Sequence, residues 1–201
     1  GLRRPLRALV PPSLAGGAMA PWPEHNPEQA RKLLQAAGYC NGSTLRFPLT
    51  FRSNVPADKL LALTWQAQVQ RDLSDCLVLD LDGVESTTIY RQLGEGAFKA
   101  VMLDWRGSYP DPEAYLTPLL SCTSVEGDIC VAGEAAISGS FWSAPGLQTA
   151  LLESDTLTGD ARRAALDRVD HLSANGATYI PVWLNSPRAW AQLNLSPPPV
   201  S

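Results

Sequence analysis

Apolar residues recur along the chain with two spacings, one typical of helices and one typical of strands. The segment NPEQARKLLQAAGY, residues 26–39, has the helical spacing and matching end signals. Asn26 suits the N-cap, Pro27 the first helical position and Gly38 the end. It therefore predicts a helix that buries one face. The apolar positions expected on that face are Ala30, Leu33, Leu34 and Ala37.

The next three segments predict a strand–helix–strand unit. LRFPLTF at residues 45–51 alternates apolar residues with polar or proline positions, as a half-buried strand does, and Pro48 favours an edge position. Residues 57–73 carry an apolar side chain at every fourth position and predict a helix. CLVLDLDG at residues 76–83 alternates again and predicts a second strand. Two strands joined in this way are expected to be parallel, with a right-handed crossover.

A third strand is predicted further along the chain. Residues 86–93 indicate a short helix, and AFKAVMLDW at residues 97–105 follows with the composition of a strand. Because every position from 101 to 103 is apolar, we expect a central strand that is covered on both faces. The apolar pattern weakens after residue 112.

The last predicted elements complete the fold class. GLQTALLES at residues 146–154 indicates a short helix, and residues 159–176 a longer one that Asp160 is expected to cap. TYIPVWL at residues 178–184 indicates a final strand. The order of elements predicts an α/β fold, with a mixed and mostly parallel sheet flanked by helices.

Composition narrows the class of protein. The chain has 201 residues, of which 45% are hydrophobic, enough to bury a core in one domain. Its formal net charge of −4 disfavours nucleic acid as a partner, because such binding needs a concentrated positive surface. No apolar run is long enough for a transmembrane helix, and no signal peptide is evident. Because the chain starts at Gly1 rather than Met, we expect it to be a piece of a longer protein.

Signals of catalysis or metal binding are weak. No GxSxG motif is present, and the spacing of cysteines and histidines does not fit a zinc site. Asp80, Asp82 and Glu85 are interpreted as a solvated strand end, and His25 and His171 as surface residues. We therefore predict no catalytic residues, no metal and no cofactor.

The cysteines leave alternatives open. Cys122 and Cys130 flank a polar segment, and their spacing suits a disulfide in an oxidising compartment as well as two reduced thiols. Nothing in the spacing assigns the state of Cys40 and Cys76.

A loop rich in aromatic residues and proline follows the predicted third strand, within DWRGSYPDPEAYLTPLLSC at residues 104–122. Ligands of open α/β sheets bind beyond the carboxyl ends of strands, where this loop lies. It offers flat aromatic faces, a guanidinium, a hydroxyl and a glycine that allows close backbone approach. The candidate ligand-binding residues are Trp105, Arg106, Gly107, Ser108, Tyr109 and Asp111.

The same loop has a purely structural interpretation. Trp105 can fill the core, and Asp111 can cap a helix that starts at Pro112, since DPEAYL is a good helix start. For Asp111 this explanation is expected to hold at least in part. For Trp105 the residues alone do not decide between packing and binding.

The order and spacing of these segments resemble one family. The helix at 26–39, the unit at 45–83 and FKAVMLDWRGSYPDPEAYLTPLLSC, followed by the elements up to about residue 190, are similar to family 5 extracellular solute-binding proteins. These are the dipeptide-, oligopeptide- and nickel-binding type that feed ABC importers. No single motif is diagnostic. Family members have two lobes and about two to three times this length.

The resemblance implies a role for the whole chain. Residues 1–201 would form a single periplasmic-binding-protein-like lobe, the C-terminal one, with the first lobe and any signal peptide outside this chain. The loop after Trp105 would line the cleft between the lobes. The resemblance also implies a disulfide between Cys122 and Cys130, a periplasmic or extracellular location, and an ABC permease in the membrane as partner.

One position departs from the family pattern. Where peptide-binding members carry an acid three residues after the tryptophan, this chain has Ser108, and a hydroxyl cannot form the charge-assisted bond to a free amine. An α-amino peptide ligand is therefore in doubt, and Arg106 favours an anionic or polar uncharged solute.

Three classes of function follow from the sequence. The first is a binding lobe that closes on a small solute, peptide-like or anionic, about a hinge. The second is an α/β hydrolase-like enzyme, and the third an interaction domain whose aromatic loop only packs. Full burial of Trp105 and Tyr109 would favour the third class. Their exposure on a concave face, beside a large apolar surface left by the absent lobe, would favour the first. An isolated lobe is expected to bind ligand weakly and to expose a face that invites dimerisation.

Overall fold

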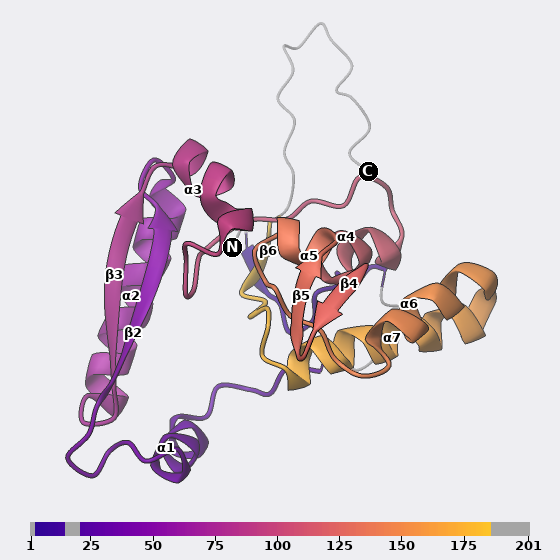
Figure 1. Ribbon diagram of the computed structural model, residues 1–201. Coiled ribbons are helices and arrows are strands. Elements are labelled where there is room, and N and C mark those ends of the chain that lie inside the picture. The colour runs from indigo at the N-terminus through magenta and orange to yellow at the C-terminus, as the bar shows by residue number, and fades with distance from the viewer. Residues whose placement is uncertain (1–2, 15–20, 186–201) are drawn as a thin grey trace, which may run out of the picture.

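The protein is described here by a computed structural model that covers residues 3–14 and 21–185 (Figure 1). The helices are α1 (Pro27–Ala36), α2 (Pro56–Leu73), α3 (Ser86–Gln92), α4 (Thr117–Leu120), α5 (Glu134–Ile137), α6 (Leu147–Thr156) and α7 (Gly159–Asn175), with 3-10 turns η1 (Leu93–Glu95) and η2 (Pro112–Tyr115). The strands are β1 (Arg3–Pro5), β2 (Leu45–Arg52), β3 (Leu77–Val84), β4 (Ser124–Glu126), β5 (Ile129–Ala132) and β6 (Trp183–Asn185). Among the residues described, none of the helices has the length and apolar character that crossing a membrane requires.

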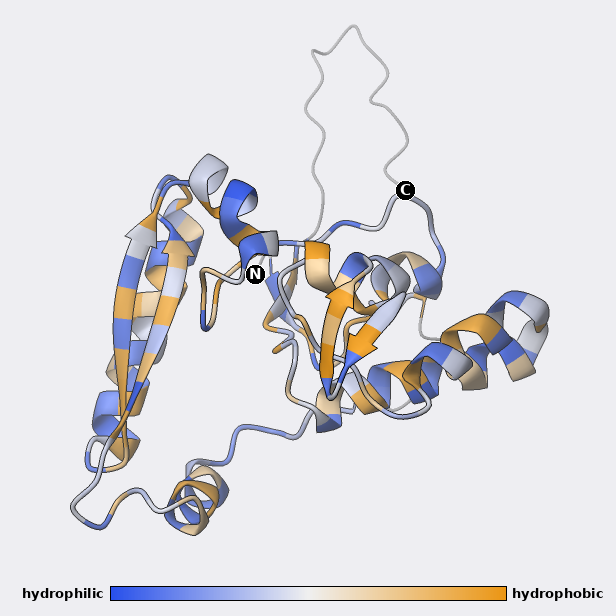
Figure 2. Cartoon of the chain, viewed as in Figure 1, coloured by the Kyte–Doolittle hydropathy of each residue, from blue (hydrophilic) through white to orange (hydrophobic). Residues whose placement is uncertain are grey.

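The predicted strand–helix–strand unit is confirmed. β2 and β3 pair in parallel, in a register that runs from Leu45 opposite Leu77 to Arg52 opposite Val84. The connecting helix α2 packs on this pair (Figure 1). Apolar and polar residues alternate along both strands, so that one face of the pair meets the helix (Figure 2).

The prediction of a central strand at residues 97–105 is wrong. The structure keeps only one parallel bridge, between Val101 and Thr50. The Thr50 N–H donates to the Ala100 carbonyl at 2.9 Å, and the Met102 N–H donates to the Thr50 carbonyl at 2.8 Å. Beyond Met102 the chain leaves the ladder, because Asp104 turns to the side chain of Arg52.

Proline explains why this pairing stays short. Backbone groups of alternate residues point to the same side of a strand, so the nitrogen of Pro48 faces the same side as that of Thr50. Thr50 uses that side for the bridge to Val101, and Pro48 has no N–H with which to extend it. This agrees with the edge character predicted from Pro48.

The strands are divided among three two-stranded sheets rather than gathered in one. β2 and β3 are parallel, whereas β1–β6 and β4–β5 are antiparallel and shorter. Pairing is therefore mixed and, by length, mostly parallel, but the expectation of one sheet was wrong. The final strand predicted at 178–184 shrinks to β6, because its partner β1 is only three residues long.

Two hydrophobic clusters form the interior. The first, called the sheet core, consists of Leu49, Phe51, Ala62, Val69, Leu73, Cys76 and Leu79. The second, called the helix core, consists of Val10, Leu116, Leu119, Leu120, Leu147, Ala150, Leu151, Leu166 and Val169. The two cores correspond to the two halves of Figure 1, with β2, α2 and β3 in one and α4 to α7 in the other. The assignment of the whole chain to one lobe stays a prediction.

The first helix forms as predicted at its ends but not on its face. Asn26 accepts the Gln29 N–H at 2.9 Å, and Gly38 ends the helix with a φ of +91°. Leu34 packs against the sheet core together with Ala30. Leu33, expected on the same face, is 63% exposed, because the helix meets the core along a narrow stripe only.

The longest C-terminal helix also departs from one expectation. The N-cap of α7 is Thr158 rather than Asp160. Thr158 is extended, and the helix begins at Gly159, which leaves Asp160 inside the first turn, where it pairs with Arg163. A negative charge is also favourable there, beside the positive end of the helix dipole.

A buried carboxylate on α7, whose role the sequence did not predict, holds the N-terminal segment around Leu9 and Val10 against this helix. Asp170 is 4% exposed and accepts the N–H groups of Leu9 (3.0 Å) and Val10 (3.2 Å). Burial raises the pKa of Asp170, although these two hydrogen bonds oppose the shift. The next residue, His171, lies at the surface as predicted, with its side chain 44% exposed.

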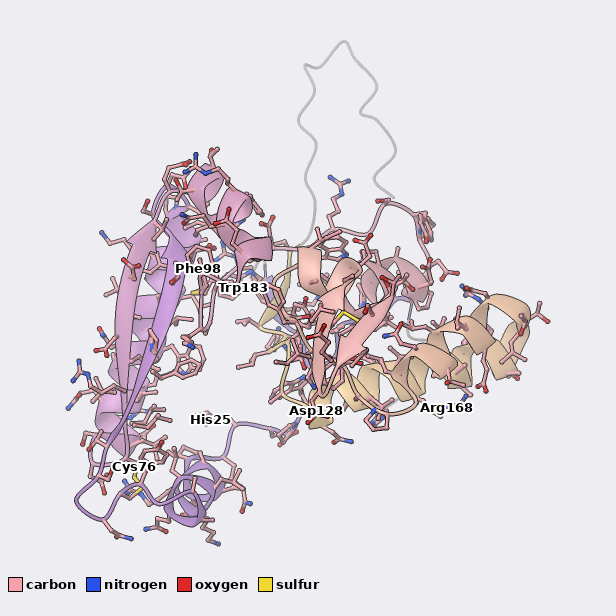
Figure 3. The ribbon with its side chains drawn as sticks, in the orientation of Figure 1. His25, Cys76, Phe98, Asp128, Arg168 and Trp183 are labelled. Carbon is pink, nitrogen blue, oxygen red and sulfur yellow. A yellow bond between two sulfur atoms is a disulfide. The ribbon has the colours of Figure 1, made fainter. Side chains whose placement is uncertain are left out.

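All four cysteines are paired. Cys122 and Cys130 form the predicted disulfide, which ties the end of α4 to β5. Cys40 and Cys76, to which the sequence assigned no partner, form a second one that ties the segment after α1 to the start of β3 (Figure 3). Asp75 lies close enough to share a metal with Cys40 and Cys76, but both sulfurs are consumed by the disulfide.

Candidate ligand-binding site

The candidate site is the segment of residues 105–110, hereafter the Trp105 loop. It starts just beyond the carboxyl end of the bridge to β2 and runs to η2. Trp105 is 46% exposed and Tyr109 49% exposed. Arg106 and Ser108 are exposed as well. The loop thus presents aromatic faces, a guanidinium and a hydroxyl to solvent, which speaks against the interpretation that it only packs.

Contacts with η2 nevertheless fix the conformation of the loop. The indole N–H of Trp105 donates to the Ala114 carbonyl at 2.9 Å, so one edge of the ring is fixed on η2. A Cβ added at Gly107 would lie 2.6 Å from the ring of Tyr115. Glycine is therefore needed here for close approach to a side chain of the same protein, while its expected approach to a ligand stays a prediction.

Substituting Gly107 is expected to displace the loop. Because the Tyr115 ring packs against the helix core, the Gly107→Ala methyl group can be accommodated only if this ring or the loop backbone moves. We expect a loss of about 1–3 kcal/mol in the free energy of unfolding, measured by urea denaturation. Ser108→Ala, one residue away on the exposed side, is the control and should change it by less than about 0.5 kcal/mol. Equal stability of the two variants would contradict the packing argument.

The hydroxyl of Tyr109 is engaged within the loop region. It donates to the carboxylate of Glu113. This hydrogen bond, followed by desolvation and the nearby carboxylates, raises the pKa of Tyr109 to about 12. The hydroxyl is therefore engaged as a donor, and the part of Tyr109 that stays exposed is its ring.

Asp111 has a structural role at the far end of the loop. One of its oxygens accepts the Glu113 N–H at 2.9 Å, which confirms the predicted cap. Both oxygens accept bonds from Arg162, at 2.8 and 3.0 Å. Burial acts to raise the pKa of Asp111, but the bonds from Arg162 and Glu113 outweigh it and the pKa lies below its usual value. Ligand contact by Asp111 stays a prediction.

The sequence did not predict a buried ionic network beside the N-terminal end of the Trp105 loop. Arg52, the last residue of β2, is 8% exposed and binds both oxygens of Asp58, at 2.7 and 3.1 Å. Its remaining nitrogen donates to Asp104 and, at 3.2 Å, to the Tyr90 hydroxyl. The bond to Asp58 raises the pKa of Arg52 against the effect of burial. The only sequence signal is an arginine directly after the buried run Leu49–Phe51 at the end of the strand.

The charge left on the loop itself is positive. Arg52 and Arg162 are both paired with carboxylates, whereas Arg106 forms no salt bridge with any residue that the structure describes. An exposed guanidinium beside Trp105 suits an anionic or hydrogen-bond-accepting group on a ligand.

Comparison with solved structures defines the class of protein as one with the periplasmic binding protein fold. The murein tripeptide binding protein MppA of Escherichia coli matches with a TM-score of 0.75 at 22% identity, over 91% of this chain and 34% of that one. OppA of Haemophilus influenzae, in complex with RPPGFSPFR, matches with 0.75 at 17%, over 90% and 34%. A Pseudoalteromonas sp. SM9913 dipeptide binding protein, in complex with Met-Leu, matches with 0.73 at 22%, over 92% and 35%.

Sequence comparison then gives the family. The family model described as bacterial extracellular solute-binding proteins, family 5 Middle, matches residues 1–127, and the chain belongs to this family. Di/tripeptide-binding protein 4 of Pseudomonas aeruginosa (strain UCBPP-PA14) is 33% identical over 130 residues, which are 63% of this chain and 24% of that protein. The chain thus spans about a quarter of that relative and a third of the solved structures. The predicted resemblance is confirmed.

Proposed function

We propose that this chain supplies one wall of the ligand cleft in a solute-binding protein that delivers its ligand to an ABC-type importer. The observation that carries the proposal is the Trp105 loop, whose Trp105 and Tyr109 stay about half exposed while their polar atoms are anchored underneath. Rigid aromatic faces with few degrees of freedom bind at low entropic cost. The other wall lies in the part of the protein that this chain does not include.

The ligand is a peptide-like or other small polar solute. The relatives named above are described as binding di- or tripeptides and longer peptides, which supports the peptide-like part. Exposed Ser108, and Arg106 without a salt bridge to any of the described residues, support a ligand that offers the loop an anionic or uncharged acceptor rather than a free amine. We propose no catalytic activity and no cofactor.

The partners and location follow from the family. We infer a periplasmic or extracellular protein that meets ABC permease subunits at the membrane, with no role in nucleic acid binding. Val125, Ile129, Val131 and Ile137, in and beside the β4–β5 hairpin, are 44–66% exposed. This apolar face, orange in Figure 2, supports contact with the rest of the protein or with a second copy.

Removing the indole tests the proposal. In the full-length protein, Trp105→Ala is expected to weaken ligand binding by tenfold or more, since truncating an aromatic hot spot costs about 2 kcal/mol or more. Isothermal titration with the dipeptide Met-Leu, its N-acetylated form and anionic solutes gives the affinities. Leu152→Ala, an exposed apolar position on α6, is the control. Unchanged affinity in Trp105→Ala would refute the role of the loop.

A further inference from the structure

We propose that Arg52 and Arg162 are positioning residues that hold the two ends of the Trp105 loop, each from a different hydrophobic core. The inference rests on the proposed function, because the loop is the ligand wall in that account. Neither arginine is placed in contact with ligand. Each acts through a carboxylate that flanks the loop, Asp104 on one side and Asp111 on the other.

The near end is fixed to the sheet core. Arg52 closes β2 directly after Phe51, which belongs to that core. Its guanidinium is held in place by two bonds to Asp58, whose side chain is 8% exposed. The third bond reaches out to Asp104, whose side chain is 67% exposed and directly precedes Trp105. Arg52 is thus held in place by Asp58 and uses its remaining nitrogen to bind Asp104 beside the loop.

The far end is fixed to the helix core. Arg162 lies at the start of α7, the helix that contributes Leu166 and Val169 to that core. It binds Asp111 through two parallel bonds, with side chains 27% and 33% exposed. Paired bonds from a planar guanidinium fix orientation as well as distance, and partial burial limits screening by solvent.

Between these two attachments the side-chain contacts of the loop go to η2, among them the hydrogen bond from the Tyr109 hydroxyl to Glu113. Trp105 bonds to Ala114 and Gly107 rests on Tyr115, and both of those partners lie in η2, on the side of Asp111. If the Arg52–Asp104 pair is lost, the loop stays attached to the helix core only. If the Arg162–Asp111 pair is lost, its attachment to the helix core is reduced to the contacts with η2. Binding must then order the loop again, and the affinity for ligand falls by the cost of that ordering.

Proteolysis tests the attachment without any ligand. Trypsin cleaves after exposed arginines in mobile segments, and Arg106 is exposed in the middle of the loop. We expect cleavage between Arg106 and Gly107, followed by mass spectrometry, to be at least tenfold faster in Asp104→Asn and in Arg162→Ala than in the wild type. Asp104→Asn is used because it leaves the pair of Arg52 with Asp58 in place.

Matched variants separate positioning from general loss of charge. Arg163→Ala removes the neighbouring arginine of α7, which pairs with Asp160 on the exposed side. Asp80→Asn breaks an exposed arginine pair on the β2–β3 sheet. Both controls are expected to cut at the wild-type rate, and Arg162→Lys, which keeps the charge but not the paired bonds, at an intermediate rate. Wild-type rates in both test variants would overturn the inference.

The same variants are then titrated in the full-length protein with the Met-Leu, N-acetyl-Met-Leu or anionic probe that the wild type binds. A loss of tenfold or more in Asp104→Asn and Arg162→Ala, with unchanged melting of the far-UV circular dichroism, is the expected result. Faster cleavage with unchanged affinity would overturn positioning of the ligand wall. A wild type that binds no probe would refute the proposed function instead, and the cleavage rates would still decide whether the arginines hold the loop.

Discussion

Replacing Cys40 and Cys76 together with serine is expected to lower the free energy of unfolding by about 4 kcal/mol. The disulfide closes a segment with a sequence separation of 36, and loop-closure entropy alone predicts a value of this size. The disulfide adds to a limited attachment, because α1 has no buried residue, packs on the sheet core through Ala30 and Leu34, and is otherwise held by the bonds from Arg31 to Asp75. Urea denaturation of the oxidised protein gives the comparison.

The second disulfide serves as the reference for this experiment. Cys122 and Cys130 have a sequence separation of 8, so their double replacement by serine is expected to cost less, about 2.5 kcal/mol. The order of the two losses is the critical result. If the Cys40–Cys76 variant is the more stable of the two, α1 is held by its packing rather than by the disulfide.

Arg52→Ala is expected to cost about 3–5 kcal/mol of unfolding free energy. The substitution leaves Asp58, which is 5% exposed, as an uncompensated charge at the end of the sheet core. Thermal and urea unfolding both measure the effect. The loop attachment through Asp104 is lost in the same variant, so the free energy of unfolding, not ligand affinity, is the quantity to compare.

A control for this prediction lies on the same strand. Arg46 pairs with Asp80 on the surface, with its side chain 70% exposed, and exposed pairs contribute at most about 1 kcal/mol. Arg46→Ala should therefore be nearly neutral. Similar losses in Arg46→Ala and Arg52→Ala would mean that burial does not determine the strength of the Arg52 network.

Local pattern was enough to predict the elements whose apolar face meets a core. Apolar residues alternate in β2 and β3 and recur at every fourth position in α2, because the strands and the helix bury these residues against each other. All three elements form as predicted. The prediction of a strand at residues 97–105 failed because its pairing depends on distant residues. The segment has the apolar character of a strand, but the pairing depends on Pro48 of another strand and on the turn of Asp104 to Arg52, which no local pattern encodes.

The same limit applies to the candidate site. The exposed loop and the cap by Asp111 follow from local sequence, and the structure reproduces the cap. The arginines that hold the loop lie about fifty residues from their partners, Arg52 before Asp104 and Arg162 after Asp111. Such contacts are set by the fold as a whole. From the sequence, each arginine is one charged residue among many.

Native mass spectrometry of the full-length protein, purified without added ligand, tests the central claim most directly. The account predicts that the wild type carries one small solute per protein, and that Trp105→Ala, at equal folded yield, carries much less of it. Equal occupancy in the two proteins, or a wild type that neither carries a solute nor takes one up from the probes, would contradict the claim that the Trp105 loop is a ligand wall.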